Sequence, residues 1–173
     1  APGSPLESDA MTVAAYQGFG TLAGAFGYVR AHGKGLFVLA ATSNPEAAAV
    51  QQAVRADGAT VAAAMVADAE AFNRELHPGE AVGSVGVVLG ATLRLAEFGI
   101  STGERPTGPA LPVLAPGFGH QGARVDQAAE IFGGLGGALL ANESRSILAG
   151  GAEGLAERVR VRAEVIREAL AEA

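Results

Sequence analysis

Two polar segments of the chain contain residue types that bind phosphate groups. Residues 116–122 read Pro-Gly-Phe-Gly-His-Gln-Gly, and residues 142–145 read Asn-Glu-Ser-Arg. Glycines let backbone N–H groups approach an anion closely, and Gln121 adds a neutral side-chain donor. Arg145 supplies a guanidinium fork whose geometry matches phosphate oxygens. The two segments together therefore predict a phosphate site.

Each of these features also has a simpler interpretation. A glycine-rich segment between a strand and a helix is often only a tight turn, and an arginine after a strand is often a solvated cap. Their occurrence at two consecutive strand ends is what favours a phosphate site. The backbone N–H groups that could then contact the anion are those of Gly119, Gly122 and Ser144.

The pattern of apolar residues predicts the elements that carry these segments. Residues 36–41 form a continuous apolar run, which is typical of a strand covered on both faces in a parallel sheet. Residues 21–31 instead place apolar side chains at spacings of three and four, as an amphipathic helix does. On the same reasoning we expect strands over residues 10–14, 36–41, 85–90, 111–115 and 138–142, and helices over residues 21–31, 45–54, 60–76, 93–98, 126–132 and 153–170.

Strands and helices thus alternate five times within one domain, residues 1–173. This order calls for a parallel sheet with right-handed crossovers, whose ligands bind beyond the carboxyl ends of the strands. Two architectures fit. One is part of a (β/α)8 barrel, in which the loops after strands seven and eight commonly bind phosphate. The other is a doubly wound α/β binding domain without catalysis, which would be complete in this chain and open at both edges.

Composition argues against several classes of function. A net charge of −6 and a pI of about 5.0 do not suit a surface for nucleic acid or an anionic membrane. The chain has no cysteine, so it has no disulfide and no cysteine metal site, which fits a reducing, cytoplasmic location. The three histidines lack metal-ligand spacing, and His32 and His77 are expected at helix ends without partners, so we expect no metal.

The ends of the chain carry no targeting signal that we recognise. Residues 1–5 read Ala-Pro-Gly-Ser-Pro, without a basic or apolar signal region, and the longest apolar runs are far too short to span a membrane. These first residues predict a loop. Because no methionine begins the chain, we expect that a part of the protein lies upstream of Ala1.

Five segments resemble, in the same order, orotidine 5'-monophosphate decarboxylases of the bacterial branch with longer chains. They are residues 11–20 (MTVAAYQGFG), 37–46 (FVLAATSNPE), 87–92 (VVLGAT), 114–122 (LAPGFGHQG) and 142–148 (NESRSIL). The resemblance covers nearly the whole chain. It implies an α/β fold, a (β/α)8 TIM barrel that is incomplete here, with strands four to eight and their helices present and strands one to three absent.

The resemblance also implies an activity and the residues that serve it. The family converts orotidine 5'-monophosphate to uridine 5'-monophosphate and carbon dioxide in pyrimidine biosynthesis, without a cofactor. Ser43 would hydrogen-bond the pyrimidine ring, and Gln121 and Arg145 would hold the 5'-phosphate. The family also places one catalytic Asp in the neighbouring subunit's site, which implies a homodimer. The alternative enzyme is another phosphate-binding barrel lyase, such as a sugar-phosphate lyase.

The resemblance also implies that the catalytic groups lie outside this chain. The family carries its catalytic Lys and Asp residues in an acidic–Lys–acidic motif on strand three, and this chain has no such motif. Its one lysine, Lys34, is expected in a turn between a helix and a strand, at the opposite end of the strand from a ligand. We therefore expect the 173-residue segment to bind substrate weakly and not to turn it over.

The chain departs from the family pattern at several positions. Ala15 stands where the family has Pro, and Gln17 stands where it has an apolar residue. Phe118 and His120 stand where small residues are common. Glu143 replaces a small polar residue near the phosphate, and its carboxylate would repel an anion if it pointed inward.

Overall fold

A parallel sheet organises the computed structural model, which describes residues 3–171 of the chain. Its strands are β1 (Ala10–Val13), β2 (Gly35–Ala41), β3 (Val85–Leu89), β4 (Val113–Pro116) and β5 (Leu139–Asn142). They lie side by side in chain order, β1-β2-β3-β4-β5, and each neighbouring pair is parallel. A doubly wound sheet reverses its strand order at a switch point. The consecutive order is that of an incomplete (β/α)8 barrel.

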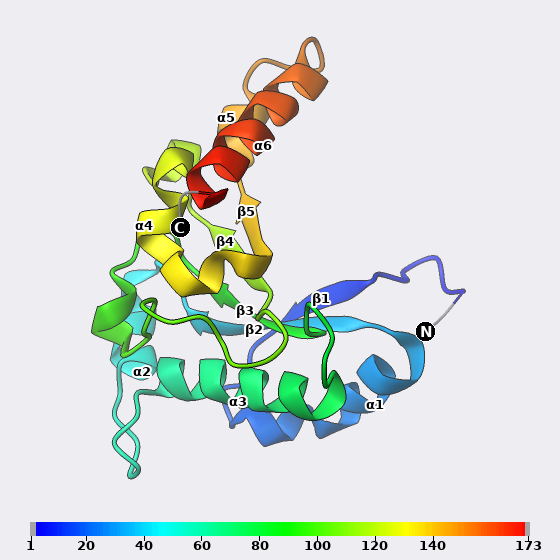
Figure 1. Ribbon diagram of the computed structural model, residues 1–173, viewed down its shortest axis with the longest axis vertical. Helices are drawn as coiled ribbons and strands as arrows, with labels where there is room; N and C mark the ends of the chain where they lie inside the picture. The colour runs from blue at the N-terminus through cyan, green and yellow to red at the C-terminus, as the bar shows by residue number, and fades with distance from the viewer. Residues whose placement is uncertain (1–2, 172–173) are drawn as a thin grey trace.

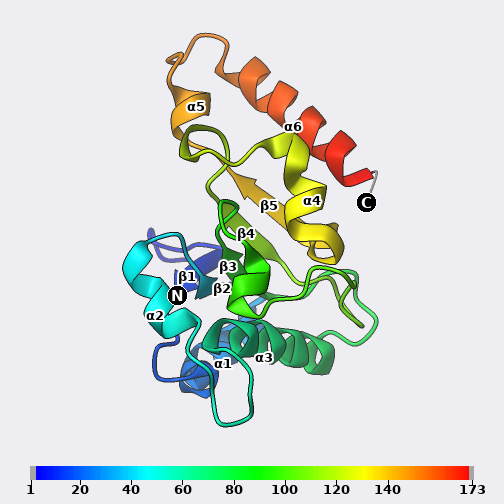
Figure 2. The same ribbon diagram turned by 90° about the vertical axis from the view of Figure 1, so that its left-hand side faces the viewer.

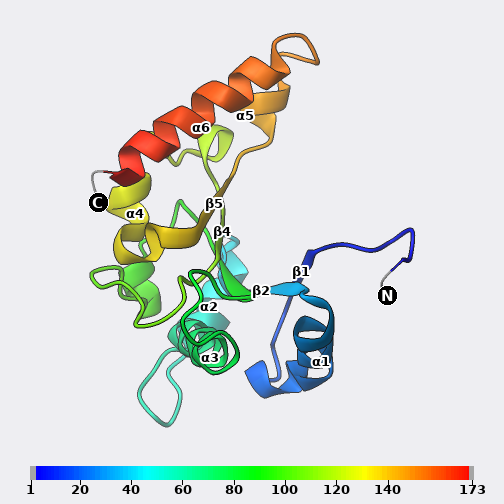
Figure 3. The ribbon, with the colours of Figure 1, turned by 45° about the vertical axis from the view of Figure 1, so that its right-hand side comes forward.

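Helices follow the strands and pack on the sheet. The α-helices are α1 (Ala23–His32), α2 (Ala48–Gln51), α3 (Val61–Leu76), α4 (Ala128–Phe132), α5 (Arg145–Leu148) and α6 (Leu155–Ala171), and short 3-10 turns cover Phe19–Leu22, Pro45–Ala47, Leu95–Phe98, Gly119–Gln121, Val125–Gln127 and Gly133–Ala138. Figure 1 shows α1 and α3 together beneath β1, β2 and β3. The other two views place α4 and α6 beside β5, at the far end of the sheet from α1 (Figures 2 and 3).

The two faces of the sheet differ in how well they are covered. In β2, Leu36, Val38 and Ala40 are buried in the core, to which α1 and α3 contribute Phe26, Val29, Met65 and Phe72. On the other face, the strand register aligns Leu39, Val88, Leu114 and Leu140 in one row across β2 to β5. Leu39 is 37% exposed and Leu140 is 46% exposed. In a closed barrel a row of this kind faces the interior.

A buried polar clamp joins α3 to β3. Asn73 is 1% exposed, and its side-chain amide forms hydrogen bonds with both the carbonyl and the N–H group of Val85. Its Nδ2 donates to the Val85 carbonyl at 2.7 Å, and its Oδ1 accepts from the Val85 N–H at 3.0 Å. Because Val85 is the first residue of β3, the clamp fixes where that strand begins against the helix. The sequence pattern did not indicate this role.

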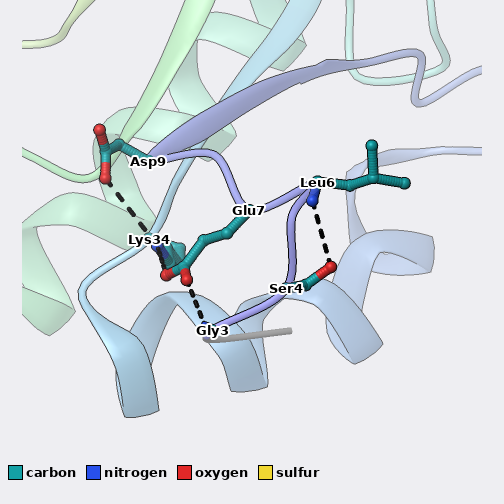
Figure 4. Close-up of polar contacts among 6 residues, drawn as sticks. All are labelled: Gly3, Ser4, Leu6, Glu7, Asp9 and Lys34. Atoms are coloured by element: carbon teal, nitrogen blue, oxygen red, sulfur yellow. Dashed lines mark hydrogen bonds and ion pairs between the residues drawn. The ribbon is translucent and has the colours of Figure 1, made fainter.

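The amino-terminal segment is fixed by Lys34, which lies between α1 and β2 (Figure 4). Its Nζ is 2.6 Å from Oε1 of Glu7 and 3.9 Å from Oδ1 of Asp9. The hydrogen bond from the Lys34 ammonium lowers the pKa of the Glu7 carboxyl, with a backbone N–H from Gly3 adding to the effect. Lys34 therefore pairs two carboxylates at the amino ends of β1 and β2, as expected of a residue outside the ligand-binding edge.

The predicted strands agree with the observed ones to within two residues at each end. The predicted helix over residues 45–54 is wrong in its last three residues, because α2 ends at Gln51. The chain then forms a hairpin-like turn, in which the Arg55 N–H donates to the Ala59 carbonyl at 2.8 Å and Val54 bridges Thr60. The four-residue helix α5 was not predicted.

Candidate functional site

The carboxyl ends of β2 to β5 meet along one edge of the sheet. The Gly90 N–H after β3 donates to the Ala41 carbonyl of β2 at 2.9 Å, and the Ala91 N–H donates to the Pro116 carbonyl of β4 at 2.8 Å. Pro116 is in turn the register partner of Asn142, the last residue of β5. The loops that carry Ser43, Gln121 and Arg145 therefore all leave the sheet at this edge, as predicted from the strand order.

Ser43 lies in a loop that a half-buried glutamine holds in place. The side chain of Gln51 accepts a hydrogen bond from the Thr42 N–H at 2.9 Å and donates to the Thr42 hydroxyl at 3.0 Å. That hydroxyl donates to Oδ1 of Asn44 at 2.6 Å. Ser43 between them is exposed, and its backbone lies close to Gly90 of the next strand end. The network fixes the backbone on both sides of Ser43 and leaves its hydroxyl to solvent.

The glycine-rich loop after β4 is closed by its own backbone. Gly119 has φ of +69° and Gly122 has φ of +110°, which favour glycine. The Gly119 N–H donates to the Ala123 carbonyl at 2.8 Å, and the Gly122 N–H donates to the Gly119 carbonyl at 2.9 Å. A phosphate contact from either N–H group would have to share or replace these bonds. Gln121 lies at the exposed tip of the loop.

Arg145 is the first residue of α5 and is exposed. Within residues 3–171 its guanidinium has no hydrogen-bond or ion-pair partner in the structure. Ser144 precedes it as the N-cap residue, and its carbonyl accepts from the Leu148 N–H at 2.9 Å. Within the described residues, Arg145 is thus an exposed cation close to the end of β5 with no carboxylate paired to it.

Three of the residues that depart from the family pattern lie in the loops after β4 and β5, and two of their side chains are buried. Phe118 is 2% exposed and packs in the core, with its ring centroid 6.2 Å from that of Phe132. His120 is exposed. The Glu143 side chain is buried, and its Oε1 is 3.3 Å from Nη2 of Arg162 and accepts a hydrogen bond from Ser146. The Glu143 carboxylate, which would repel an anion if it pointed toward the ligand, is paired with a cation.

Gln121 and Arg145, two of the three predicted ligand contacts, lie on segments that pack against each other. Gly119, in the turn that carries Gln121, packs directly against Glu143 and Ser146, which flank Arg145 in the chain. Ser43 lies two strands away, at the end of β2. Sequence reasoning did not identify Gln51 or Arg162, because both act through contacts with residues distant in the chain. An acidic residue directly after a predicted strand, Glu143, was the one sequence feature that called for a cationic partner.

The remaining polar groups do not suggest another kind of site. His77 was expected to lack partners, and this expectation is wrong. Its Nε2 is 2.6 Å from the Ser84 hydroxyl, and its Nδ1 is 3.2 Å from Oε2 of Glu80. Among residues 3–171, no group of three or more acidic, histidine or cysteine side chains is arranged to hold a metal ion. In the same part of the chain, no helix combines the length and apolar character needed to cross a membrane.

Residues 3–156 match the model of a protein family described as Orotidine 5'-phosphate decarboxylase / HUMPS family. The chain is 44% identical over 157 residues to the orotidine 5'-phosphate decarboxylase of Salinispora tropica, covering 91% of this chain and 53% of that protein. It is 42% identical over 154 residues to the enzyme of the same name from Corynebacterium glutamicum, covering 87% of this chain and 51% of that protein. The chain thus spans about half the length of the curated relatives it matches.

Solved structures show the same similarity in three dimensions. A crystal structure assigned to an orotidine 5'-phosphate decarboxylase of Streptomyces avermitilis superposes with a TM-score of 0.83 at 41% identity, over 97% of this chain and 56% of that one. The Leishmania donovani OMP decarboxylase superposes with a TM-score of 0.61 at 27% identity, over 95% of this chain and 57% of that one. The consecutive parallel strands are therefore the arrangement found in part of these larger chains.

Proposed function

The chain belongs to the Orotidine 5'-phosphate decarboxylase / HUMPS family, and we propose that the whole protein converts orotidine 5'-monophosphate to uridine 5'-monophosphate and carbon dioxide in de novo pyrimidine biosynthesis. One observation carries the proposal. Within a sequence that matches the family from residue 3 to residue 156, the loops bearing Ser43, Gln121 and Arg145 leave one edge of a parallel sheet.

In this proposal the chain binds the substrate. Gln121 and Arg145 hold the 5'-phosphate, and Ser43 hydrogen-bonds the pyrimidine ring. Backbone N–H groups of Gly119, Gly122 and Ser144 are further candidate phosphate contacts. The exposure of the Gln121 and Arg145 side chains supports the assignment, because a guanidinium without an internal carboxylate partner is available for a bidentate contact with phosphate. Binding energy gained at the remote phosphate can be used at the reacting carbon.

The chemical step would be performed by residues outside this chain. A carboxylate would destabilise the substrate carboxylate, and a neighbouring lysine would protonate the ring carbon as carbon dioxide leaves, without a cofactor. Lys34 does not suit this role, because it pairs with Glu7 and Asp9 at the amino ends of the strands. The 173-residue chain by itself is accordingly proposed to be inactive.

The proposal is tested with the full-length protein and the 173-residue chain side by side. Full-length protein should consume orotidine 5'-monophosphate and release one carbon dioxide for each uridine 5'-monophosphate formed, whereas the short chain should show no turnover. Full-length protein that binds but never decarboxylates this nucleotide would contradict the proposed activity. Turnover by the short chain would contradict the location of the catalytic groups.

We further propose that the complete protein is a cytoplasmic homodimer. The dimer is supported by the chain's family membership and by a charged fraction of only 17%, which is compatible with a buried subunit face. The cytoplasmic location is supported by the proposed substrate, a phosphorylated nucleotide of central metabolism. Full activity of a protein that stays monomeric through a dilution series would contradict the dimer, and recovery outside the cytoplasmic fraction would contradict the location.

A further inference from the structure

Glu143 is a buried carboxylate at the point where β5 ends. Its side chain is 6% exposed, although Asn142 and Ser144 on either side of it are exposed. Oε1 accepts a hydrogen bond from the Ser146 hydroxyl and lies 3.3 Å from Nη2 of Arg162, a residue of α6. Oε2 is buried and has no hydrogen-bond partner within residues 3–171. A carboxylate so poorly hydrated is retained in a fold only where its partners hold it firmly.

Glu143 also lies directly against the glycine-rich loop. A Cβ atom on Gly119 would be 2.1 Å from Oε1 of Glu143 and 2.3 Å from Oγ of Ser146. Gly119 adopts φ of +69°, so both its conformation and its surroundings favour glycine. The carboxylate therefore separates two short segments, the turn that ends at Gln121 and the helix that begins at Arg145.

The charge of Glu143 must be neutralised for an anion to bind close by. A carboxylate beside a phosphate repels it, and the repulsion is weakly screened in a buried position. Arg162 reaches the carboxylate from α6 and lines the same pocket as Gly119 and Gly122. The ion pair therefore links α6 to both loops and removes the repulsion that an unpaired Glu143 would exert.

We propose that Glu143, held by Arg162 and Ser146, is a positioning residue that sets the spacing between Gln121 and Arg145 for the phosphate of a nucleoside 5'-monophosphate. The proposal rests on the proposed function, because it takes Gln121 and Arg145 as the phosphate contacts. Arg162 acts through Glu143 and does not itself touch the nucleotide.

A double-mutant cycle on the full-length protein tests this role, with binding of uridine 5'-monophosphate measured by calorimetry. Arg162→Met leaves the buried carboxylate unpaired beside the phosphate, so the dissociation constant should rise about tenfold or more, which corresponds to about 1.4 kcal/mol. Adding Glu143→Gln to that variant removes the charge and keeps an acceptor for Ser146. The double variant should therefore bind at least about threefold more tightly than Arg162→Met alone.

Two comparisons separate positioning from a general structural role. Arg160→Met removes a neighbouring arginine of α6 whose ion pairs with Glu157 and Glu164 are exposed, and it should leave the affinity for uridine 5'-monophosphate unchanged. Uridine, which has no phosphate, should bind all variants equally. A double variant that binds as weakly as Arg162→Met, or an equal loss for uridine, would overturn the proposal.

A second pair of variants serves if Arg162→Met does not fold, as judged by its melting temperature. Glu143→Gln retains the acceptor for Ser146, whereas Glu143→Leu has a similar size and no polar atom. The Leu variant should bind uridine 5'-monophosphate at least about threefold more weakly than the Gln variant, and equal affinities would overturn the proposal. Wild-type protein that binds no uridine 5'-monophosphate would overturn the proposed function as well, whereas binding that is insensitive to these substitutions would overturn this proposal alone.

Discussion

At the scale of single residues, the polar side chains of the candidate site fall into two groups that differ in exposure. Ser43, Gln121 and Arg145 are exposed at the ligand-binding edge. Gln51 and Glu143 are at least partly buried and hold the loops that carry the first group. Exposed polar groups are free to bind a ligand, whereas buried ones must have their hydrogen bonds satisfied within the fold. Substitutions in the two groups should therefore differ in their effects on binding and on stability.

Arg145→Ala in the full-length protein should weaken the reaction of the phosphorylated substrate specifically. Losing a hydrogen bond to a charged group costs about 1.5–3 kcal/mol. Because about 1.4 kcal/mol is one decade in rate, kcat/KM for orotidine 5'-monophosphate should fall at least about tenfold. The loss should largely vanish for orotidine, which lacks the phosphate. Steady-state kinetics with both substrates measures the difference.

The matched control for this prediction is Arg167→Ala, which removes an exposed arginine of α6 away from the ligand-binding edge. It should leave kcat/KM for both substrates unchanged. If Arg145→Ala lowered kcat/KM equally for orotidine and its phosphate, Arg145 would be a solvated helix-capping residue and would not belong to the site.

The strand ends and the family resemblance pointed to Ser43, Gln121 and Arg145, whose ligand contacts stay a prediction, but nothing in the sequence pointed to the contacts of the supporting residues. Ser43, Gln121 and Arg145 lie in the loops after predicted strands, where a parallel sheet binds its ligands. The bond of Gln51 to Thr42 depends on how the segment between β2 and α2 brings the end of α2 back to the end of β2, and that of Arg162 to Glu143 depends on where α6 packs. Neither arrangement follows from periodicity.

At the scale of elements, the strands were predictable because four of the five contain at least three consecutive apolar residues. The helices were harder wherever they are short. Residues 52–54 were expected to continue the helix, yet they lead into a turn closed by Arg55 and Ala59. Four-residue helices such as α5 bury too few side chains to leave a periodic pattern.

Gln51→Ala should loosen the loop after β2. It removes the acceptor of the half-buried Thr42 N–H, which costs about 1–3 kcal/mol when the group is left unsatisfied. In the full-length protein we expect a lower free energy of unfolding and a higher KM, because Ser43 follows Thr42 directly. Urea unfolding and steady-state kinetics measure the two effects.

Gln52→Ala is the control for this change, since it replaces the neighbouring glutamine at the end of the same helix. Its effect on KM should be negligible. A Gln51→Ala variant that loses stability while KM stays unchanged would show that the loop does not position Ser43.

Lys34→Met should change how the stability of the full-length protein depends on pH. The pKa of Glu7 is lowered in the folded state, chiefly by the hydrogen bond from Lys34. Such a group contributes stability above its unfolded pKa of about 4.3 and loses it as pH falls through the folded value. The melting temperature of Lys34→Met should therefore lie below that of wild type at pH 6–7, and the two should converge as the pH falls through the lowered pKa of Glu7.

Salt gives an independent check on this prediction, because an exposed ion pair is screened by ions. The difference between wild type and Lys34→Met at pH 7 should shrink as ionic strength rises. A difference that is constant in both pH and salt would mean that Lys34 acts through packing alone, and that its pairing with Glu7 contributes no stability.

At the scale of the whole molecule, the sheet has one covered face and one poorly covered face. The row of Leu39, Val88, Leu114 and Leu140 belongs to the second face, and within residues 3–171 the edge strands β1 and β5 each pair with one neighbour. Unpaired strand edges next to exposed apolar side chains favour association with other chains.

The 173-residue chain should therefore self-associate when it is purified alone. We expect its mean mass, measured by light scattering during size-exclusion chromatography, to rise with concentration. Leu140→Lys places a charge on the exposed face of β5 and should reduce the association. Val159→Lys changes an exposed apolar residue of α6 and should not. A chain that stays monomeric, or an equal response to both substitutions, would contradict the prediction that the poorly covered face of the sheet drives self-association.

The consecutive strand order also governs the route by which the chain folds. Each strand pairs with the one that precedes it in the chain, so each pairing closes only the single connection between those two strands. Closing a loop loses more entropy as the loop lengthens, and topologies rich in local contacts fold faster. The longest loop is the one between β2 and β3, which contains both α2 and α3. Once α3 has docked on β2, the bond between Asn73 and Val85 leaves only the short segment after α3 to be ordered.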